Sequence, residues 1–255
     1  MKKILLVLLA TAAISPAMAK ESAYKLANPL YRPTAKAGVI GGEISYARQP
    51  KDLDIPQEKA ESYRFVPEIS YGLTDKLAFN AAAGYGRAKG KSGVIKGDRA
   101  NEYSAKAGIS YLIASAEGFD FNVNADFLYE KERTKIGGAS RSRHHSGVDV
   151  GLLVGKKIDK LTPYFGIGFE SDLWSSRWTK RGTETYINPG IYIDLCDKVA
   201  LDLNYESITH GDATYKGIID FYPQDNVVVG VGAFMVHPET DTNQYGGLAN
   251  IKVKF

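Results

Sequence analysis

The residues best suited to chemistry in this sequence are two histidines followed by a serine, His144, His145 and Ser146. A serine hydroxyl becomes a nucleophile when a histidine nitrogen accepts its proton, and such a pair can attack an ester. In an extended chain His144 and Ser146 share one face, whereas His145 points to the other. A third residue that would orient the histidine is not evident. The pattern therefore defines an esterase hypothesis, with Ser146 as nucleophile and His144 as base.

Other kinds of site find little support in the sequence. Cys196 is the one cysteine, so an intramolecular disulfide cannot form. No spacing of cysteines and histidines is typical of a metal site, and no phosphate-binding glycine loop occurs, so we expect neither metal nor cofactor. The net charge of +3 over 255 residues is close to balance. This balance argues against nucleic acid as a partner.

The elements that would position these residues are strands, because apolar and polar residues alternate along most of the chain. In residues 119–130 the odd positions are apolar from Phe119 to Tyr129, and most even positions hold Asp, Asn or Glu. A period of two is typical of a strand with one apolar and one polar face. Twelve such segments follow one another: 38–47, 62–73, 77–87, 102–113, 119–131, 146–157, 161–172, 185–195, 199–208, 215–222, 226–236 and 246–255. Each has about ten residues, which is the length of a tilted strand that crosses a bilayer.

The connections between these segments alternate strictly between short and long. The short ones are 74–76, 114–118, 158–160, 196–198 and 223–225, and three of them share a residue-Asp-Lys core. The long ones, near 48–61, 88–101, 132–145, 173–184, 209–214 and 237–245, carry charge. Tight periplasmic turns and long outer loops are typical of outer-membrane barrels. We therefore predict an all-β fold, a transmembrane antiparallel up-and-down barrel of about twelve strands over 37–255, with ten as the alternative count.

Aromatic residues on the apolar face gather at both ends of the predicted strands. Such girdles mark the two interfaces of a membrane. Near the loop ends lie Tyr46, Tyr63, Tyr85, Tyr103, Tyr129, Phe169, Tyr205 and Tyr215, and near the turn ends lie Tyr71, Phe79, Phe119, Phe121, Phe165, Phe221 and Phe255. The sorting favours a membrane barrel over a soluble one.

The first 36 residues differ from the rest. Residues 1–19 have the order of a secretory signal: two lysines, an apolar run, and Ala17-Met18-Ala19 as the site where the peptidase cuts. We expect cleavage after Ala19. Residues 20–36 contain Pro29 and Pro33, which discourage a strand. We interpret them as a periplasmic lead-in, with a short plug inside the lumen as the alternative.

The closing segment, GGLANIKVKF, resembles the C-terminal signal of bacterial outer-membrane proteins. In that signal alternate apolar residues lead to a final Phe, and Ile251, Val253 and Phe255 fill these places. The hairpins YGLTDKLAFNAAAGYG and YPQDNVVVGVGAF also resemble that superfamily. The resemblance implies the outer membrane of a Gram-negative bacterium and recognition by the barrel assembly machinery. It implies little about activity, beyond a porin-like member of that superfamily.

If the apolar face meets lipid, the polar face lines a lumen. Acids outnumber bases on it: Glu43, Glu68, Asp126, Asp149, Glu170, Asp194, Asp202, Glu206 and Asp220 against Arg64, Lys106, Lys216 and Lys252. One interpretation is a narrow, cation-attracting pore for small solutes or cations. The other is a structural barrel that is sealed by ion pairs. Twelve strands leave a lumen between a packed eight-stranded barrel and an open porin.

Three of the long connections are basic. They carry Lys89, Lys91, Lys96 and Arg99; Arg133, Lys135, Arg141 and Arg143; and Arg177, Lys180 and Arg181 beside Trp174 and Trp178. Cations beside aromatic rings at the outer rim could bind the phosphates of lipopolysaccharide. Solvated loop charge is the simpler explanation, and a surface adhesin that acts through its loops is a further alternative.

Two enzyme classes share features with the sequence. The His-x-Ser spacing of His144 and Ser146 resembles outer-membrane phospholipase A and lipid A deacylases, although those continue with Asn where this chain has Gly147. His210 and Asp212 loosely resemble the pairs of outer-membrane proteases, but Asp52 and Asp54 are the nearest substitute for their paired aspartates. We therefore expect a barrel without catalysis, with the lipid esterase as the competing hypothesis.

Overall fold

The computed structural model describes residues 24–49, 60–91, 96–136, 139–175, 182–209, 211–238 and 243–255. The predicted signal at residues 1–19 lies outside the described residues. Among the described residues, no helix is long and apolar enough to cross a membrane.

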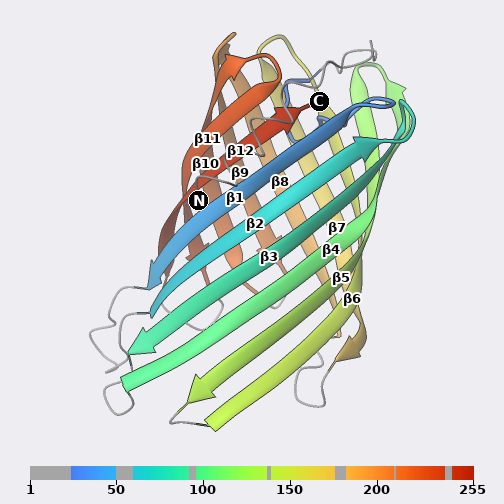
Figure 1. The fold of residues 1–255 in the computed structure, drawn as a ribbon. Helices are drawn as coiled ribbons and strands as arrows, with labels where there is room; N and C mark the ends of the chain where they lie inside the picture. Colours follow the sequence, from blue (N-terminus) through green and yellow to red (C-terminus); the bar gives the residue numbers. More distant parts are fainter. Residues whose placement is uncertain are drawn as a thin grey trace.

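Twelve strands form one closed antiparallel barrel, and the predicted fold and strand number are confirmed (Figure 1). Each strand pairs with its neighbours in sequence, and β1 pairs with β12 to close the ring. The strands are β1 (Gly38–Gln49), β2 (Ala60–Gly72), β3 (Leu77–Lys91), β4 (Lys96–Ala116), β5 (Phe119–Ile136), β6 (Ala139–Lys156), β7 (Leu161–Ser175), β8 (Thr183–Cys196), β9 (Val199–Ile208), β10 (Ala213–Gln224), β11 (Val227–His237) and β12 (Gln244–Lys254).

The seam between the first and last strands is fully paired. The register runs from Val39 opposite Lys254 to Arg48 opposite Tyr245. Two backbone hydrogen bonds, each 2.8–2.9 Å long, join Gly38 and Phe255 beyond the last strand residue. A Cβ on Gly38 would collide with the ring of Phe255. The Phe255 ring therefore covers this glycine, and only a residue without a side chain fits beneath it.

The outward face is apolar, as the alternation predicts. Large apolar side chains of one parity are exposed on every strand except β6, from Ile44 on β1 to Val231 on β11 and Tyr245 on β12. Aromatic rings pair across neighbouring strands, with centroids 5.0 Å apart for Tyr46 and Tyr63, and 4.9 Å apart for Tyr205 and Tyr215. Lipid offers backbone groups no hydrogen-bond partner. Because the ring is closed, no strand is left at a sheet edge with unpaired backbone groups.

Several strands run further than the sequence indicated, and the corresponding loops are shorter. The connections expected at 88–101 and 132–145 are largely strand, because β3 and β4 reach Lys91 and Lys96, and β5 and β6 reach Ile136 and Ala139. β4, β5 and β6 hold 21, 18 and 18 residues. The backbone ladder continues past the apolar alternation, since strand pairing does not require apolar side chains.

Candidate functional site: the barrel lumen

The structure places the predicted lumen residues on the inward face. The outward parity holds the exposed apolar residues, and the opposite parity faces the interior of the closed ring. The inward side chains include Glu43, Arg64, Glu68, Lys106, Asp126, Asp149, Glu170, Asp194, Asp202, Glu206 and Lys252. Lys216 and Asp220 share this face on β10. Whether these residues line a conducting path stays a prediction.

Ion pairs join several of these side chains across the lumen wall. Lys106 Nζ lies 2.8 Å from Asp126 and 3.3 Å from Asp149, on the two following strands. Lys216 on β10 reaches Glu43 on β1 at 3.2 Å, across β11 and β12. Three further contacts are Lys252 to Glu68 at 3.6 Å, Arg64 to Glu102 at 3.6 Å, and Lys157 to Asp194 at 3.9 Å. The lumen is therefore partly neutralised, and acids remain in excess.

His145 is buried on the inward face between two carboxylates. Its Nε2 lies 3.1 Å from Glu170 and its Nδ1 lies 3.0 Å from Asp172. Because the two acids lie against opposite nitrogens of the ring, they cannot join the histidine in binding one metal ion. No cluster of three metal ligands occurs among the residues that the structure describes.

A set of inward tyrosines was missed at the sequence level. Tyr164 donates a hydrogen bond of 2.8 Å to the buried carboxylate of Asp202, and Tyr186 donates one of 2.9 Å to Asp149. Each tyrosine reaches a strand two positions away by lying over glycines, since a Cβ on Gly190 would collide with Tyr164. The sequence contained a signal for them, because both tyrosines occupy positions at which the side chains of their strands face the lumen.

The N-terminal segment, residues 24–36, closes the turn end of the lumen. Leu26 and Leu30 are only 5% and 4% exposed. Leu26 packs in one cluster with the inward residues Tyr192, Tyr222 and Val228. The arrangement matches the plug alternative more closely than a free lead-in, while the domain boundaries stay predictions.

Polar contacts fasten this segment at both ends. Lys25 Nζ lies 3.1 Å from Asp194 and donates a 2.9 Å hydrogen bond to the carbonyl of Cys196. Arg32 donates to Asn122 at 2.9 Å and to the carbonyl of Asp75. The Asp75 carboxylate accepts the amide of Ala35 at 3.3 Å, and the Thr74 hydroxyl accepts the amide of Leu77 within the turn at 3.0 Å.

The middle of the segment is joined to the barrel through a pair of tyrosines. The amide of Ala27 donates to Tyr222 at 3.2 Å, and Tyr222 shares a 2.5 Å hydrogen bond with Tyr192. Burial raises the pKa of Tyr31 to about 12, so this side chain stays neutral at physiological pH. The contact between the segment and the barrel therefore buries neutral, hydrogen-bonded tyrosines, which cost less to remove from water than charged groups.

Above the segment the lumen holds water-accessible space. One cavity of about 320 Å³ has Ala27 and Pro29 as its floor. Its charged wall consists of Glu43, Glu68, Asp202, Asp220, Lys216 and Lys252. A second cavity of about 210 Å³ lies between Pro29 and the side chains of Tyr164, Tyr186 and Asn188. The charged part of the lumen is thus hollow above a closed floor.

The esterase residues lie in strand β6 and not in a loop. His144 Nδ1 and the hydroxyl of Tyr129 are 3.3 Å apart, while Ser146 donates to the carbonyl of Trp174 at 3.4 Å. Each side chain thus has a different partner, and the serine hydroxyl is directed away from a general base. The protease residues Asp52, Asp54 and His210 lie outside the described residues, as do Arg177, Trp178, Lys180 and Arg181.

The comparisons with known proteins rest on structure. No family model matches the chain, and no curated protein matches it by sequence. The translocator domain of the autotransporter NalP from Neisseria meningitidis is 13% identical with a TM-score of 0.62, covering 100% of this chain and 94% of that one. This chain has the fold of an outer-membrane β-barrel protein.

Two more outer-membrane barrels resemble it to a similar degree. The COG4313 outer membrane channel from Pseudomonas putida F1 is 10% identical with a TM-score of 0.60, covering 93% of this chain and 100% of that one. The transport unit of the autotransporter AIDA-I from Escherichia coli is 10% identical with a TM-score of 0.59, covering 91% and 93%. At these identities an outer-membrane barrel shares its fold with channels and with autotransporter units, and its own activity must be argued from its lumen.

Proposed function

We propose that this barrel is a small, cation-preferring channel without catalysis, closed at its turn end by residues 24–36. The observation that carries the proposal is the charged cavity above Ala27 and Pro29. A barrel that served only as structure would gain more stability from a packed apolar lumen, because buried charges that are imperfectly paired are destabilising.

The negative charge of the lumen wall supports cations as the preferred solute. The cavity wall holds four carboxylates, Glu43, Glu68, Asp202 and Asp220, against the two ammonium groups of Lys216 and Lys252. An excess of carboxylates in a narrow aqueous passage attracts cations and repels anions. The ion pairs reduce this bias and narrow the passage without removing it.

The closed floor implies that conduction requires the segment to move. Two buried leucines and the Lys25 and Arg32 contacts hold it in place. The strands around it are held by continuous ladders, whereas the segment forms a single β-bridge, between Ala35 and Gly72. Displacing residues 24–36 therefore opens the lumen without breaking the barrel.

Planar-bilayer recording of the purified full-length protein tests this proposal. We expect rare openings of small conductance. Under a salt gradient their reversal potential should lie closer to the equilibrium potential of the cation than to that of the anion. A variant that lacks residues 24–35 but retains the export signal should open for longer. Glu68→Gln in the deleted form should weaken the cation preference.

The outcomes separate the channel from the sealed structural barrel. A folded deletion variant that never conducts would reject the channel and leave the structural interpretation. Heat-modifiable migration on gels gives the fold control, because an intact barrel migrates faster before boiling. Anion preference in the deletion variant would contradict the role of the carboxylates.

Export and assembly are further parts of the proposal. Cleavage after Ala19 predicts a mature chain that begins at Lys20, which intact-mass measurement of the purified protein checks. Ile251, Val253 and Phe255 have the parity of the exposed Tyr245, although Val253 is buried in the folded barrel, so assembly factors would read them before the barrel closes. Phe255→Ala should lower the yield of folded barrel in the membrane while leaving refolding in detergent intact.

A further inference from the structure

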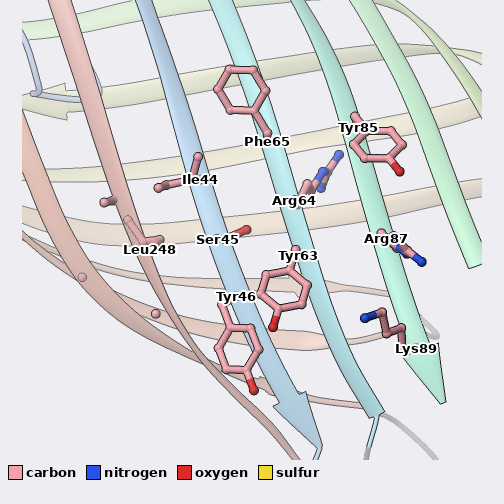
Figure 2. Close-up of a pocket in the computed structure, with 13 residues that line it drawn as sticks. Ile44, Ser45, Tyr46, Tyr63, Arg64, Phe65, Tyr85, Arg87, Lys89 and Leu248 are labelled. Carbon is pink, nitrogen blue, oxygen red and sulfur yellow. The ribbon is translucent and has the colours of Figure 1, made fainter. Parts of the chain in front are cut away.

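A hollow of about 840 Å³ lies in the outer wall of the barrel, near the loop ends of β1, β2 and β3. Figure 2 shows the rings of Tyr46, Tyr63, Phe65 and Tyr85 on one face of these strands, with Ile44 beside them. All five side chains belong to the outward parity and are exposed. The hollow therefore faces the membrane and not the lumen.

The side of the hollow formed by β12 is made of small residues. Gly247 lies opposite Tyr46, and Ala249 lies opposite Ile44. A Cβ on Gly247 would meet no atom nearer than the carbonyl oxygen of Gly232 at 3.6 Å, so the space above it is open. Small residues beside large aromatic rings create a groove, and an acyl chain gains free energy by covering apolar surface there.

Cations lie at the loop end of this groove. Arg87 and Lys89 line it on β3, with Arg87 opposite Tyr63 and Lys89 closer to the strand end (Figure 2). Arg48 on β1 and Arg99 on β4 belong to the same outward row as Lys89, and Glu61 is the one acid within that row on β1 to β4 as described. Neighbouring strands are about 4.8 Å apart, so these cations extend over roughly 15 Å. Such a row matches a headgroup with more than one phosphate.

Arg87 has a donor that nothing in the protein uses. Its Nε is buried and has no hydrogen-bond partner among the described residues. An unsatisfied buried donor on a charged group is costly, and a guanidinium is suited to bind phosphate through two parallel hydrogen bonds. Because Nε is covered by protein atoms, a phosphate would contact the terminal nitrogens, and the unpaired Nε shows that the protein does not hold the guanidinium at that atom.

We propose that this groove binds a phosphorylated, multiply acylated glycolipid of the outer leaflet, of the lipid A class. A phosphate contacts Arg87 and Lys89, and one acyl chain lies over Gly247 and Ala249 between the rings. A two-chain phospholipid would leave either the far cations or part of the groove unoccupied. Lys89 and Arg99 belong to the first of the three basic connections, so the site places part of the predicted lipopolysaccharide contact on the outer wall. It does not depend on conduction through the lumen.

Native mass spectrometry of the purified full-length barrel tests the site, with diphosphoryl lipid A and phosphatidylglycerol as the two probes. Arg87→Ala should weaken lipid A binding about tenfold or more, because it removes a charge-assisted contact. Gly247→Leu should weaken it as well, by filling the groove where no backbone atom is displaced. The matched control is Lys131→Ala, which removes an outward cation on β5 away from the groove.

Each result decides for or against the proposal. Support requires that lipid A binds more tightly than phosphatidylglycerol, and that both groove variants lose this preference while Lys131→Ala retains it. Equal binding of the two lipids, or unchanged binding in Arg87→Ala and Gly247→Leu, would overturn it. Arg87→Lys distinguishes charge from geometry, since it keeps the charge and loses the two-point contact.

Discussion

Leu26→Ala should open the channel without harming the barrel. Leu26 is 5% exposed and packs against Tyr192, Tyr222 and Val228 at the turn end. Truncation to Ala removes about three carbons, each worth about 0.8 kcal/mol of burial, so docking of the segment weakens by roughly 2.5 kcal/mol. At 1.4 kcal/mol per factor of ten, the ratio of open to closed time rises about 60-fold.

Single-channel dwell times in planar bilayers measure this ratio directly. Lys25→Ala gives a graded comparison, because its ion pair with Asp194 is partly exposed and is worth about 1 kcal/mol, or roughly a fivefold change. Leu203→Ala on the lipid face is the control and should leave gating unchanged. If Leu26→Ala folds and its open-to-closed ratio equals that of the intact protein, the segment does not gate the lumen.

Three further predictions concern the wall and the unused serine. Tyr164→Phe should lower the free energy of unfolding by about 1 kcal/mol in urea titrations, since the buried Asp202 carboxylate loses the Tyr164 hydroxyl and keeps its hydrogen bond with Asn204. Tyr186→Phe should cost less, because Asp149 is less buried and keeps Lys106 at 3.3 Å. Gly38→Leu should reduce the folded fraction on gels, since the Phe255 ring occupies that space. The intact barrel and Ser146→Ala should both show lipid-ester hydrolysis at background. Hydrolysis by the intact barrel that is lost in Ser146→Ala would contradict the proposal of a barrel without catalysis.

The membrane-crossing part of the barrel follows from the sequence because lipid imposes a strong pattern. Each strand must show apolar residues at every second position, and all twelve segments were found in this way. The same parity predicted which face each charged residue occupies. Beyond the bilayer that constraint does not apply. The strand ends that carry Arg99 and Arg133 are paired, yet their residues are as polar as those of a loop. The far ends of β3 to β7 were therefore assigned to connections.

The plugged end of the lumen had no local signal of this kind. Residues 24–36 show no period, and their partners Asn122, Asp194 and Tyr222 are far away in sequence. Contacts of this kind depend on which strands face each other across the closed ring. The outer-wall groove was missed for a similar reason, since Gly247 and Arg87 line one groove only when β12 closes on β1.

The unequal strand lengths give the barrel an oblique rim. β4 to β6 have 18 to 21 residues, whereas β9 to β12 have 10 to 12. A tilted strand rises about 2.5 Å per residue, so the longer strands extend roughly 20 Å further from the membrane. In Figure 1 the loop ends of β4 to β6 project toward the bottom of the view. The extended ends of β4 to β6 thus form a wall on one side of the entrance. We expect a solute to approach from the side of β9 to β12, and the paired ends of β5 and β6 to offer an antibody an epitope above the lipid.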